Sequence, residues 1–542
     1  MGPYIDGHLL SWLIFMPGLT VLGLLLSSGV FRTVFASQGM PGEVWRALAL
    51  SSTSLTAALA WLGTLQGFDS EHLGLQFIEH AEWMPRVGLH YFVAMDGISL
   101  PLVLMVTTLV PLVLLASWHQ VERSLRSFVF YVLSLETAVL GVLLAWNVLL
   151  FHVFWQLALI LVFFLIGSWG GPRGVRAATR FLLVTGLGSF CMGLAILVLA
   201  QLNLDAAGLP NLDLVAVSGS SAPGLLDRPF AATGIGVPWW RGELGLFAGF
   251  ALAFAAVLPL VPLHLWLPSA EQHSPGAGAA LIAGLLLLLG PYGFLRLALP
   301  LFPTAAESVA PYLMALAVAG VLYAVIRGAL QVDLARRFAF VSVAQLGLVV
   351  AGLFSMTESG LVGGVVATLS HSLTAAGLFF VVGLLHDRRR TGRIDAFGGL
   401  AHPMPVLATL LAIVMGTALG LPLFSGFVGD LLLLAGIAQT DLVVLAGAVV
   451  GVVGLAVLLL LTYRRILLGP LRVPENRGLI DLNLRERAIL VVLIVPMLWL
   501  GLHPNPVLRR VEPSVLELMR HMDGRRAQLP SVVPMEAPEL AP

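Results

Sequence analysis

The chain has 542 residues and no net formal charge, with 58% hydrophobic and only 11% charged side chains. An ordinary soluble domain is about 45–50% apolar and about 25% charged, so a soluble or secreted globular protein is excluded. The neutral balance does not suggest nucleic-acid binding, and the single cysteine, Cys191, excludes an intramolecular disulfide and an all-cysteine zinc or iron–sulfur site within this chain.

Apolar stretches long enough to cross a hydrocarbon core of about 30 Å recur along the whole sequence. We expect an all-α polytopic membrane protein with about 14 transmembrane helices. The first apolar segment has no basic region before it, so it is expected to be a retained helix and not a cleaved signal. In chain order, the expected segments are 8–27, 46–65, 92–116, 128–146, 148–169, 179–201, 246–268, 278–301, 308–327, 338–355, 360–385, 403–437, 441–463 and 487–503.

Arginine is concentrated in the loops that follow odd-numbered segments. Cytoplasmic loops of membrane proteins carry an excess of basic residues, so these loops are expected on the cytoplasmic side and both termini on the outer side. All 29 basic residues are arginine, and the sequence holds no lysine. Because arginine keeps its proton in proteins, no relay that needs lysine can be built from this chain. The loops are VERSLR (121–126), GPRGVRAATR (171–180), QVDLARR (331–337), DRRRTGR (387–393) and TYRR (462–465).

The seventh and twelfth segments are interrupted by proline and glycine, in VLPLVPLHLWLP (257–268) and GLPLFSGFVGD (420–430). Proline removes a backbone donor and breaks the helical ladder. Interruptions at corresponding places of two halves indicate inverted repeats with an ion site near the membrane midplane, whereas the alternative is the ordinary abundance of proline in membrane helices. The repeat interpretation divides the chain into 1–120, 121–302, 303–466 and 467–542.

Ionisable side chains inside apolar segments are candidates for a proton path, because each costs about 2.5–3.5 kcal/mol to insert. Glu136 lies in the fourth segment, His264 in the seventh, His371 in the eleventh, and Asp430 follows the interruption of the twelfth. Histidine and a desolvated carboxylate can both exchange protons near neutral pH. The structural alternatives are a partner arginine for Glu136 and a helix-capping role for Asp430.

Other polar residues are expected near the membrane interfaces, by snorkelling or by pairing there. The sequence contains no glycine-rich dinucleotide fingerprint after a strand, no P-loop and no paired zinc motif, so redox chemistry and ATP hydrolysis are not expected in this chain. The interfacial set consists of His152, Glu271, Arg296, Asp333, Arg336 and Arg337.

Five long motifs then occur in a fixed order: MDGISLPLVL (95–104), PLHLWLPSA (262–270), PYGFLRLALPLFP (291–303), LSHSLTAAGLFFVVGLLHDRRRTGRI (369–394) and LPLFSGFVGD (421–430). They resemble the antiporter-like membrane subunits of respiratory complex I and of Mrp-type cation/proton antiporters, from about residue 90 to 465. The resemblance implies two inverted five-helix repeats with broken helices 7 and 12, and other membrane-arm subunits as partners in a bacterial inner membrane. It also implies that NADH, FMN, iron–sulfur clusters and quinone are bound only by those partners.

The sequence departs from that family at three relay positions. Where the family carries a glutamate on the fifth helix and lysines on the seventh and eighth, this chain has Gln156, Val257 and Leu288. Glu136, His264, His371 and Asp430 match family positions that are kept. A buried carboxylate without its partner would be costly, so the joint loss of both charges is physically coherent.

The favoured interpretation is a complex I-like membrane-arm subunit whose first-repeat relay is disabled. Two alternatives remain: a pumping subunit with a rerouted path, for example through water from Glu136, and a subunit of a cation/proton antiporter or bicarbonate-uptake complex.

Overall fold

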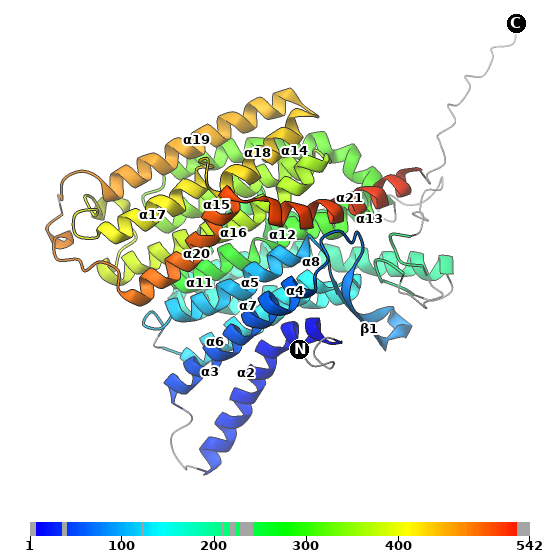
Figure 1. Ribbon diagram of the computed structural model, residues 1–542, viewed down its shortest axis with the longest axis horizontal. Coiled ribbons are helices and arrows are strands. Elements are labelled where there is room, and N and C mark those ends of the chain that lie inside the picture. The colour runs from blue at the N-terminus through cyan, green and yellow to red at the C-terminus, as the bar shows by residue number, and fades with distance from the viewer. Residues whose placement is uncertain are drawn as a thin grey trace, which may run out of the picture.

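The computed structural model describes residues 7–34, 41–121, 123–207, 210–216, 223–227, 242–471 and 473–527. Within these ranges, 11 helices are long and apolar enough to cross a membrane, or up to 12 if one bent pair is counted as a single span. Figure 1 shows the helices running side by side in one bundle, in an order that largely follows the sequence. The expectation of a helical polytopic membrane protein is therefore confirmed.

The first half of the chain supplies the following elements: α2 (Leu9–Val34), α3 (Gly42–Leu59), α4 (Leu65–Gly67), β1 (Gln76–Met84), β2 (Leu89–Met95), α5 (Ser99–Ala116), α6 (Leu125–Leu144), α7 (Val148–Trp169), α8 (Gly171–Ala207), α9 (Glu243–Val257), α10 (Leu267–His273), α11 (Gly276–Leu281), α12 (Leu289–Gly293) and α13 (Leu299–Leu301). The last three belong to one span, Gly276–Leu301, which is buried over its whole apolar window.

The second half supplies eight α-helices within the described residues. Its elements are α14 (Pro303–Ala329), α15 (Leu334–Leu353), α16 (Glu358–Arg389), α17 (Pro405–Ala418), α18 (Ser425–Ala438), α19 (Leu442–Leu467), α20 (Leu484–Leu502) and α21 (Asn505–Ala527).

Both expected helix interruptions are present. Helix α9 ends at Val257, and a short turn of 3-10 helix, Leu263–Trp266, leads into α10. The indole of Trp266 donates to the carbonyl of Ala256 over 2.8 Å, which ties the two sides of this interruption together. Helix α17 ends at Ala418, and α18 begins only at Ser425. Proline and glycine thus break the ladder where the sequence indicates.

The expected number of 14 spans is not established by these helices. Every expected segment contains a helix, but α9, α17 and α18 fall among the shorter apolar helices of 10–17 residues. One expectation was wrong in detail: the third segment does not begin as a helix at residue 92, because residues up to Met95 belong to β2 and α5 starts at Ser99.

The antiparallel hairpin of β1 and β2 is the one sheet in the described residues, and an all-α expectation misses it. Gly88, with φ of +71°, forms its turn in a conformation that glycine adopts without strain.

The carboxylate of Glu79 on β1 accepts hydrogen bonds from the backbone of Leu10 (2.7 Å) and Ser11 (3.2 Å). A negative charge is favoured at this N-terminal end of α2. The side chain of Ser11 also bonds the Tyr91 hydroxyl over 2.7 Å, and burial raises the pKa of Tyr91 to about 12.

The arginine-rich loops meet at one end of the bundle, here called the arginine-rich end. The indole of Trp169 donates to the carbonyl of Arg123 (3.1 Å), and Arg337 donates to the hydroxyl of Thr462 (3.0 Å). Asp333 caps α15 by accepting from the backbone of Arg336 (3.1 Å). Arg173, Asp333 and Arg390, which belong to three of these loops, line one cavity. Together with the two bonds above, this places the loops after five different spans on one side, as the arginine pattern predicts.

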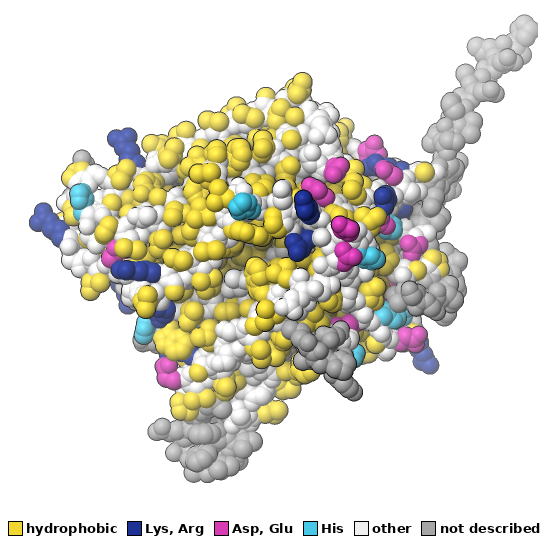
Figure 2. All heavy atoms as spheres, in the orientation of Figure 1, with side chains coloured by type: hydrophobic (Ala, Val, Ile, Leu, Met, Phe, Trp, Pro, Cys, Tyr) yellow, Lys and Arg dark blue, Asp and Glu magenta, His cyan; other side chains and the backbone are white. Residues whose placement is uncertain are grey.

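The hairpin, the start of α2 and helix α21 lie at the opposite end, here called the hairpin end. The backbone of Gly97, just after β2, donates to the hydroxyl of Ser514 on α21 over 2.8 Å. Arg525 at the far end of α21 donates to the carbonyl of Leu225 over 2.8 Å. Figure 2 shows hydrophobic side chains over the middle of the visible face and charged side chains mainly toward its two ends.

Candidate functional site

Asp430 lies in the second turn of α18, and its side chain faces the interruption that separates α18 from α17. Its carboxylate reaches back over Gly420, so that a Cβ built on Gly420 would lie 2.6 Å from Asp430 Oδ2. Gly420 also has a φ of +64°, in the left-handed region. Glycine is therefore needed at this position both for the backbone conformation and to leave room for the carboxylate.

His371 on α16 reaches the same interruption through Gln345 on α15. His371 Nδ1 lies 3.1 Å from Gln345 Oε1, and Gln345 Nε2 donates over 3.3 Å to the carbonyl of Ala418, the last residue of α17. A carbonyl at a helix end has no partner within the helix, so the glutamine satisfies a group that the interruption frees. His371 is thus linked through Gln345 to the end of α17, and the Asp430 carboxylate lies over Gly420 in the same interruption.

A second polar contact joins α16 to the start of α18. The hydroxyls of Ser370 and Ser425 lie 2.8 Å apart, and both side chains are buried. Ser370 directly precedes His371 in the sequence. Polar groups from three helices therefore line the gap in the second half.

Gln156, Val257 and Leu288, where the sequence departs from the resembled family, are here called the degenerate positions, and the first half is apolar at two of them. Val257, the last residue of α9, and Leu288, just before α12, have 0% exposed area. The two regions pack directly, because a Cβ built on Gly290 would lie 2.5 Å from the Cβ of Leu258. Neither position offers a group that could carry a charge.

Aromatic side chains pack between the elements that carry these positions. The ring centroids of Trp155 and Phe254 are 5.4 Å apart, and those of Phe254 and Phe294 are 5.6 Å apart. Phe151 stacks on Trp155 at 5.8 Å. Such pairs contribute about 0.5–1.5 kcal/mol each beyond their buried area. They join α7, α9 and the Gly276–Leu301 span by apolar packing.

Gln156, the third degenerate position, is only half-buried. Its side-chain nitrogen lies 3.3 Å from Nε2 of His152, one turn earlier on α7. His152 also lies against α8, since a Cβ on Gly193 would be 3.3 Å from the same nitrogen. The other ring nitrogen of His152 is buried without a hydrogen-bond partner among the described residues. The sequence carries a signal for this pair, because residues at positions i and i+4 are neighbours on a helix.

Glu136 and His264 are both enclosed. Glu136 on α6 has 0% exposed area, and neither carboxylate oxygen has a hydrogen-bond partner in the described part of the chain. The alternative of an arginine partner for Glu136 is therefore not observed among these residues. His264 lies in the interruption after α9, with its ring edge-to-face against Tyr323 of α14 at 5.2 Å. It thus lies where the first half contacts the second.

Glu271 was expected near a membrane interface, and the structure places it at the arginine-rich end of the bundle. This residue of α10 is 1% exposed, so it is enclosed by protein. It lines a cavity of about 540 Å³ at the arginine-rich end, together with Arg173, His273, Asp387 and Arg390. Both of its carboxylate oxygens are buried without a partner among the described residues. The one feature of the sequence that could have indicated a functional role for Glu271 is its place on the short helix α10, directly after an interruption.

Arg296 was expected to snorkel or to pair near a membrane interface, and the structure shows it paired and buried close to the hairpin end. Its guanidinium donates to Asp96 Oδ1 over 2.7 Å and to the Tyr292 hydroxyl over 3.0 Å. The guanidinium carbon also lies 4.2 Å from the ring centroid of Trp146. Asp96 and Arg296 belong to two of the five motifs, so these motifs are joined in space by a buried ion pair.

With this geometry described, comparison with known proteins identifies the family. The family described as "NADH:quinone oxidoreductase/Mrp antiporter, TM" matches residues 145–456. This chain belongs to that family. The description "NADH-ubiquinone oxidoreductase chain 4, amino terminus" matches residues 52–145. The family resemblance read from the five motifs is confirmed.

Relatives within the NADH:quinone oxidoreductase/Mrp antiporter family align over nearly their full length. NADH-quinone oxidoreductase subunit M of Rhodobacter capsulatus is 34% identical over 95% of this chain and 97% of that protein. NADH-ubiquinone oxidoreductase chain 4 of Arabidopsis thaliana is 33% identical over 86% of this chain and 90% of that protein. A chain of respiratory complex I from Thermus thermophilus, solved with bound NADH, has 26% identity and a TM-score of 0.81 over 95% of this chain and 99% of that chain.

Proposed function

We propose that this chain is the counterpart of chain M in an NADH–quinone oxidoreductase of the complex I type, where it takes part in proton translocation. The observation that carries the proposal is the alignment with subunit M of Rhodobacter capsulatus over 97% of that protein. In this role its partners are other membrane-arm subunits of a bacterial inner membrane. NADH, FMN, the iron–sulfur clusters and quinone then belong to partner subunits.

The proposal includes a topology. Residues 121–302 and 303–466 form two inverted repeats, flanked by 1–120 and 467–542, and each repeat contains one of the interruptions described above. The arginine-rich end faces the cytoplasm, because basic loops are retained on that side. Both termini then face outward.

Within this frame, protons cross through the second repeat by way of His371 and Asp430. The contacts that support this path are the His371–Gln345 pair at 3.1 Å and the bond from Gln345 to the end of α17. Glu136 and His264 are candidates for passing protons toward that path from the first repeat. Their enclosure and the place of His264 against α14 support this role.

The first-repeat relay is disabled in this proposal. A proton relay needs groups that gain and lose charge, and Gln156, Val257 and Leu288 cannot do so near neutral pH. Replacement of a buried ion pair by uncharged residues of similar size is often neutral or stabilising. The aromatic packing of Trp155 and Phe254 beside these positions is consistent with such a replacement.

The test is the proton-to-electron ratio of the assembled complex in proteoliposomes. The ratio should be lower than that of a homologue that carries the lysines, and Asp430→Asn should remove most of the remaining translocation. The triple variant Gln156→Glu, Val257→Lys and Leu288→Lys should raise the ratio. A ratio equal to that of the lysine-bearing homologue would reject the disabled relay, and normal NADH-driven proton translocation without this chain would reject the proposed role altogether.

A rerouted first-repeat path is the second candidate, and the contact between His152 and Gln156 favours it. Histidine can exchange protons near neutral pH, and the amide could orient it. His152→Phe separates the two candidates. A disabled relay predicts an unchanged proton-to-electron ratio in this variant, whereas a rerouted path predicts a lower one.

A further inference from the structure

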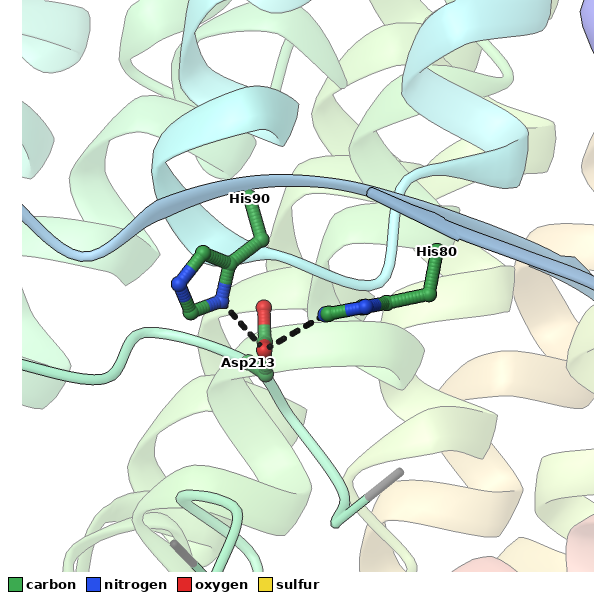
Figure 3. A group of neighbouring side chains, drawn as sticks. All are labelled: His80, His90 and Asp213. Carbon is green, nitrogen blue, oxygen red and sulfur yellow. Dashed lines mark hydrogen bonds and ion pairs between the residues drawn. The ribbon is translucent and has the colours of Figure 1, made fainter. Parts of the chain in front are cut away.

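Two histidines of the hairpin meet one carboxylate from the loop after α8. His80 on β1 and His90 on β2 have ring centroids 5.4 Å apart. Figure 3 shows both rings directed at Asp213. His90 Nδ1 lies 2.7 Å and His80 Nε2 3.5 Å from the same oxygen, Asp213 Oδ2. The three ligand atoms all lie within 4.8 Å of one another.

The three side chains are presented by backbone that is held in place. On the antiparallel hairpin, His80 pairs with Phe92 and Glu82 pairs with His90, so both histidines are on one face. Asp213 forms an isolated bridge with Asn147. The backbone amides on either side of that bridge bond across it, from Val148 to the Leu212 carbonyl (2.9 Å) and from Leu214 to the Trp146 carbonyl (2.8 Å).

The side chain of Asn147 orients the carboxylate of Asp213. Asn147 Nδ2 donates to Asp213 Oδ1 over 2.8 Å, which leaves Oδ2 for the histidines. Asn147 is itself fixed, because its Nδ2 also donates to the Gly88 carbonyl (2.9 Å) and its Oδ1 accepts from the backbone of Leu149 (3.1 Å). Such outer partners set the orientation of metal ligands and affect affinity by about 10–100-fold.

We propose that His80, His90 and Asp213 form a binding site for a divalent transition metal of the zinc class. Two imidazoles and one carboxylate are a set that binds Zn²⁺ with an open fourth position for water. Bond lengths of about 2.0–2.2 Å place tetrahedral ligand atoms about 3.3–3.5 Å apart. The separation of His80 and Asp213 already fits at 3.5 Å, and that of His90 and Asp213 must open from 2.7 Å.

The solvent exposure of the three side chains and the tautomer of His90 are both compatible with metal binding. The side chains of His80 and His90 are 23% and 14% exposed, and that of Asp213 is 5% exposed, so the site is reached from solvent at the hairpin end. The metal needs the lone pair of His90 Nδ1, so the neutral ring must carry its proton on Nε2. The bound ion would join β1, β2 and the loop after α8 at one point. This inference does not depend on the proposed function.

The experiment uses the full chain in nanodiscs, without a histidine tag, stripped with a chelator and titrated with Zn²⁺ alone. We expect one saturable equivalent per chain that His90→Gln or His80→Gln weakens by at least about tenfold. Asp213→Asn keeps the shape of the side chain and should weaken binding as well. His402→Gln is the matched control, because His402 is exposed and belongs to the loop that bonds Leu467 at the arginine-rich end, and it should bind as the unchanged chain does.

X-ray absorption on the zinc-loaded, unsubstituted chain removes any dependence on whether the variants fold. We expect scattering from two imidazoles and from oxygen ligands. The proposal is overturned by the absence of a stoichiometric equivalent, by a zinc spectrum with oxygen ligands only, or by unchanged affinity in both histidine variants.

Discussion

Substitution of Gly420 by alanine tests whether the position of the Asp430 carboxylate matters for transport. The new Cβ would lie 2.6 Å from Asp430 Oδ2. An ordinary C···O contact is about 3.3 Å, so the carboxylate must move by about 0.7 Å. The positive φ of Gly420 adds about 1–2 kcal/mol of backbone strain for any residue with a Cβ.

Gly469→Ala is the matched control for this substitution. Gly469 has a φ of +89°, and a Cβ there would meet nothing within 4 Å. Both variants should therefore lose a similar amount of stability, about 1–2 kcal/mol. Only Gly420→Ala also displaces a side chain of the proposed proton path.

The assay is NADH-driven acidification in proteoliposomes that contain the assembled complex, with thermal unfolding measured in parallel. Misplacement of a reacting group by about 1 Å can cost about 100-fold in rate, so a shift of about 0.7 Å should lower translocation by about tenfold or more. Gly469→Ala should translocate as the unsubstituted protein does. Equal translocation by the two variants would refute the argument that Asp430 must lie over Gly420.

Substitutions at three further positions test the packing. Asp96→Ala should lower the free energy of unfolding by about 3–5 kcal/mol, because Arg296 would be left charged and unpaired in the interior. Asp96→Asn should cost less, since it keeps the Oδ1 that accepts from the backbone of Ser99, and equal losses would contradict a contribution from this hydrogen bond. Gly97→Ala would place a Cβ 1.6 Å from the Arg510 carbonyl, so it should cost at least about 2 kcal/mol and expose α21 to limited proteolysis; an unaltered digestion pattern would count against that contact. Glu271→Gln should leave the melting temperature unchanged or raise it, because the carboxylate has no partner to lose among the described residues, and a clear fall would reveal one.

The helix interruptions could be predicted because their causes are local. Proline in VLPLVPLHLWLP and glycine in GLPLFSGFVGD change the backbone at the residues where they stand, whatever packs around them. His371 and Asp430 could be singled out one by one as ionisable residues in apolar segments, but the sequence did not indicate that both lie beside the same interruption. Gln345, which joins His371 to the end of α17, could not be chosen among the polar residues of its segment, because its role depends on which helices become neighbours.

Two features could not be predicted from the sequence: the enclosure of Glu271 by protein and the β-hairpin. The hydropathy of a segment indicates that it crosses the membrane. It does not tell whether protein or lipid surrounds a given residue of that segment. Glu271 was expected near an interface, and the sequence did not indicate that protein encloses it there. The hairpin was missed because QFIEHAEWM alternates poorly and most of β1 is exposed.

Helix α21 has a consequence for the order in which this protein is made. It is the final described helix, and its bonds reach back across 417 residues to Gly97 and across 300 residues to Leu225. It also contacts α16, α14 and α13, which come from both halves. A ribosome must therefore finish almost the whole polypeptide before these contacts can form, so the hairpin end is completed last during biosynthesis. A premature stop within α21 would leave the earlier helices inserted, but the hairpin end would lack the contacts that α21 makes.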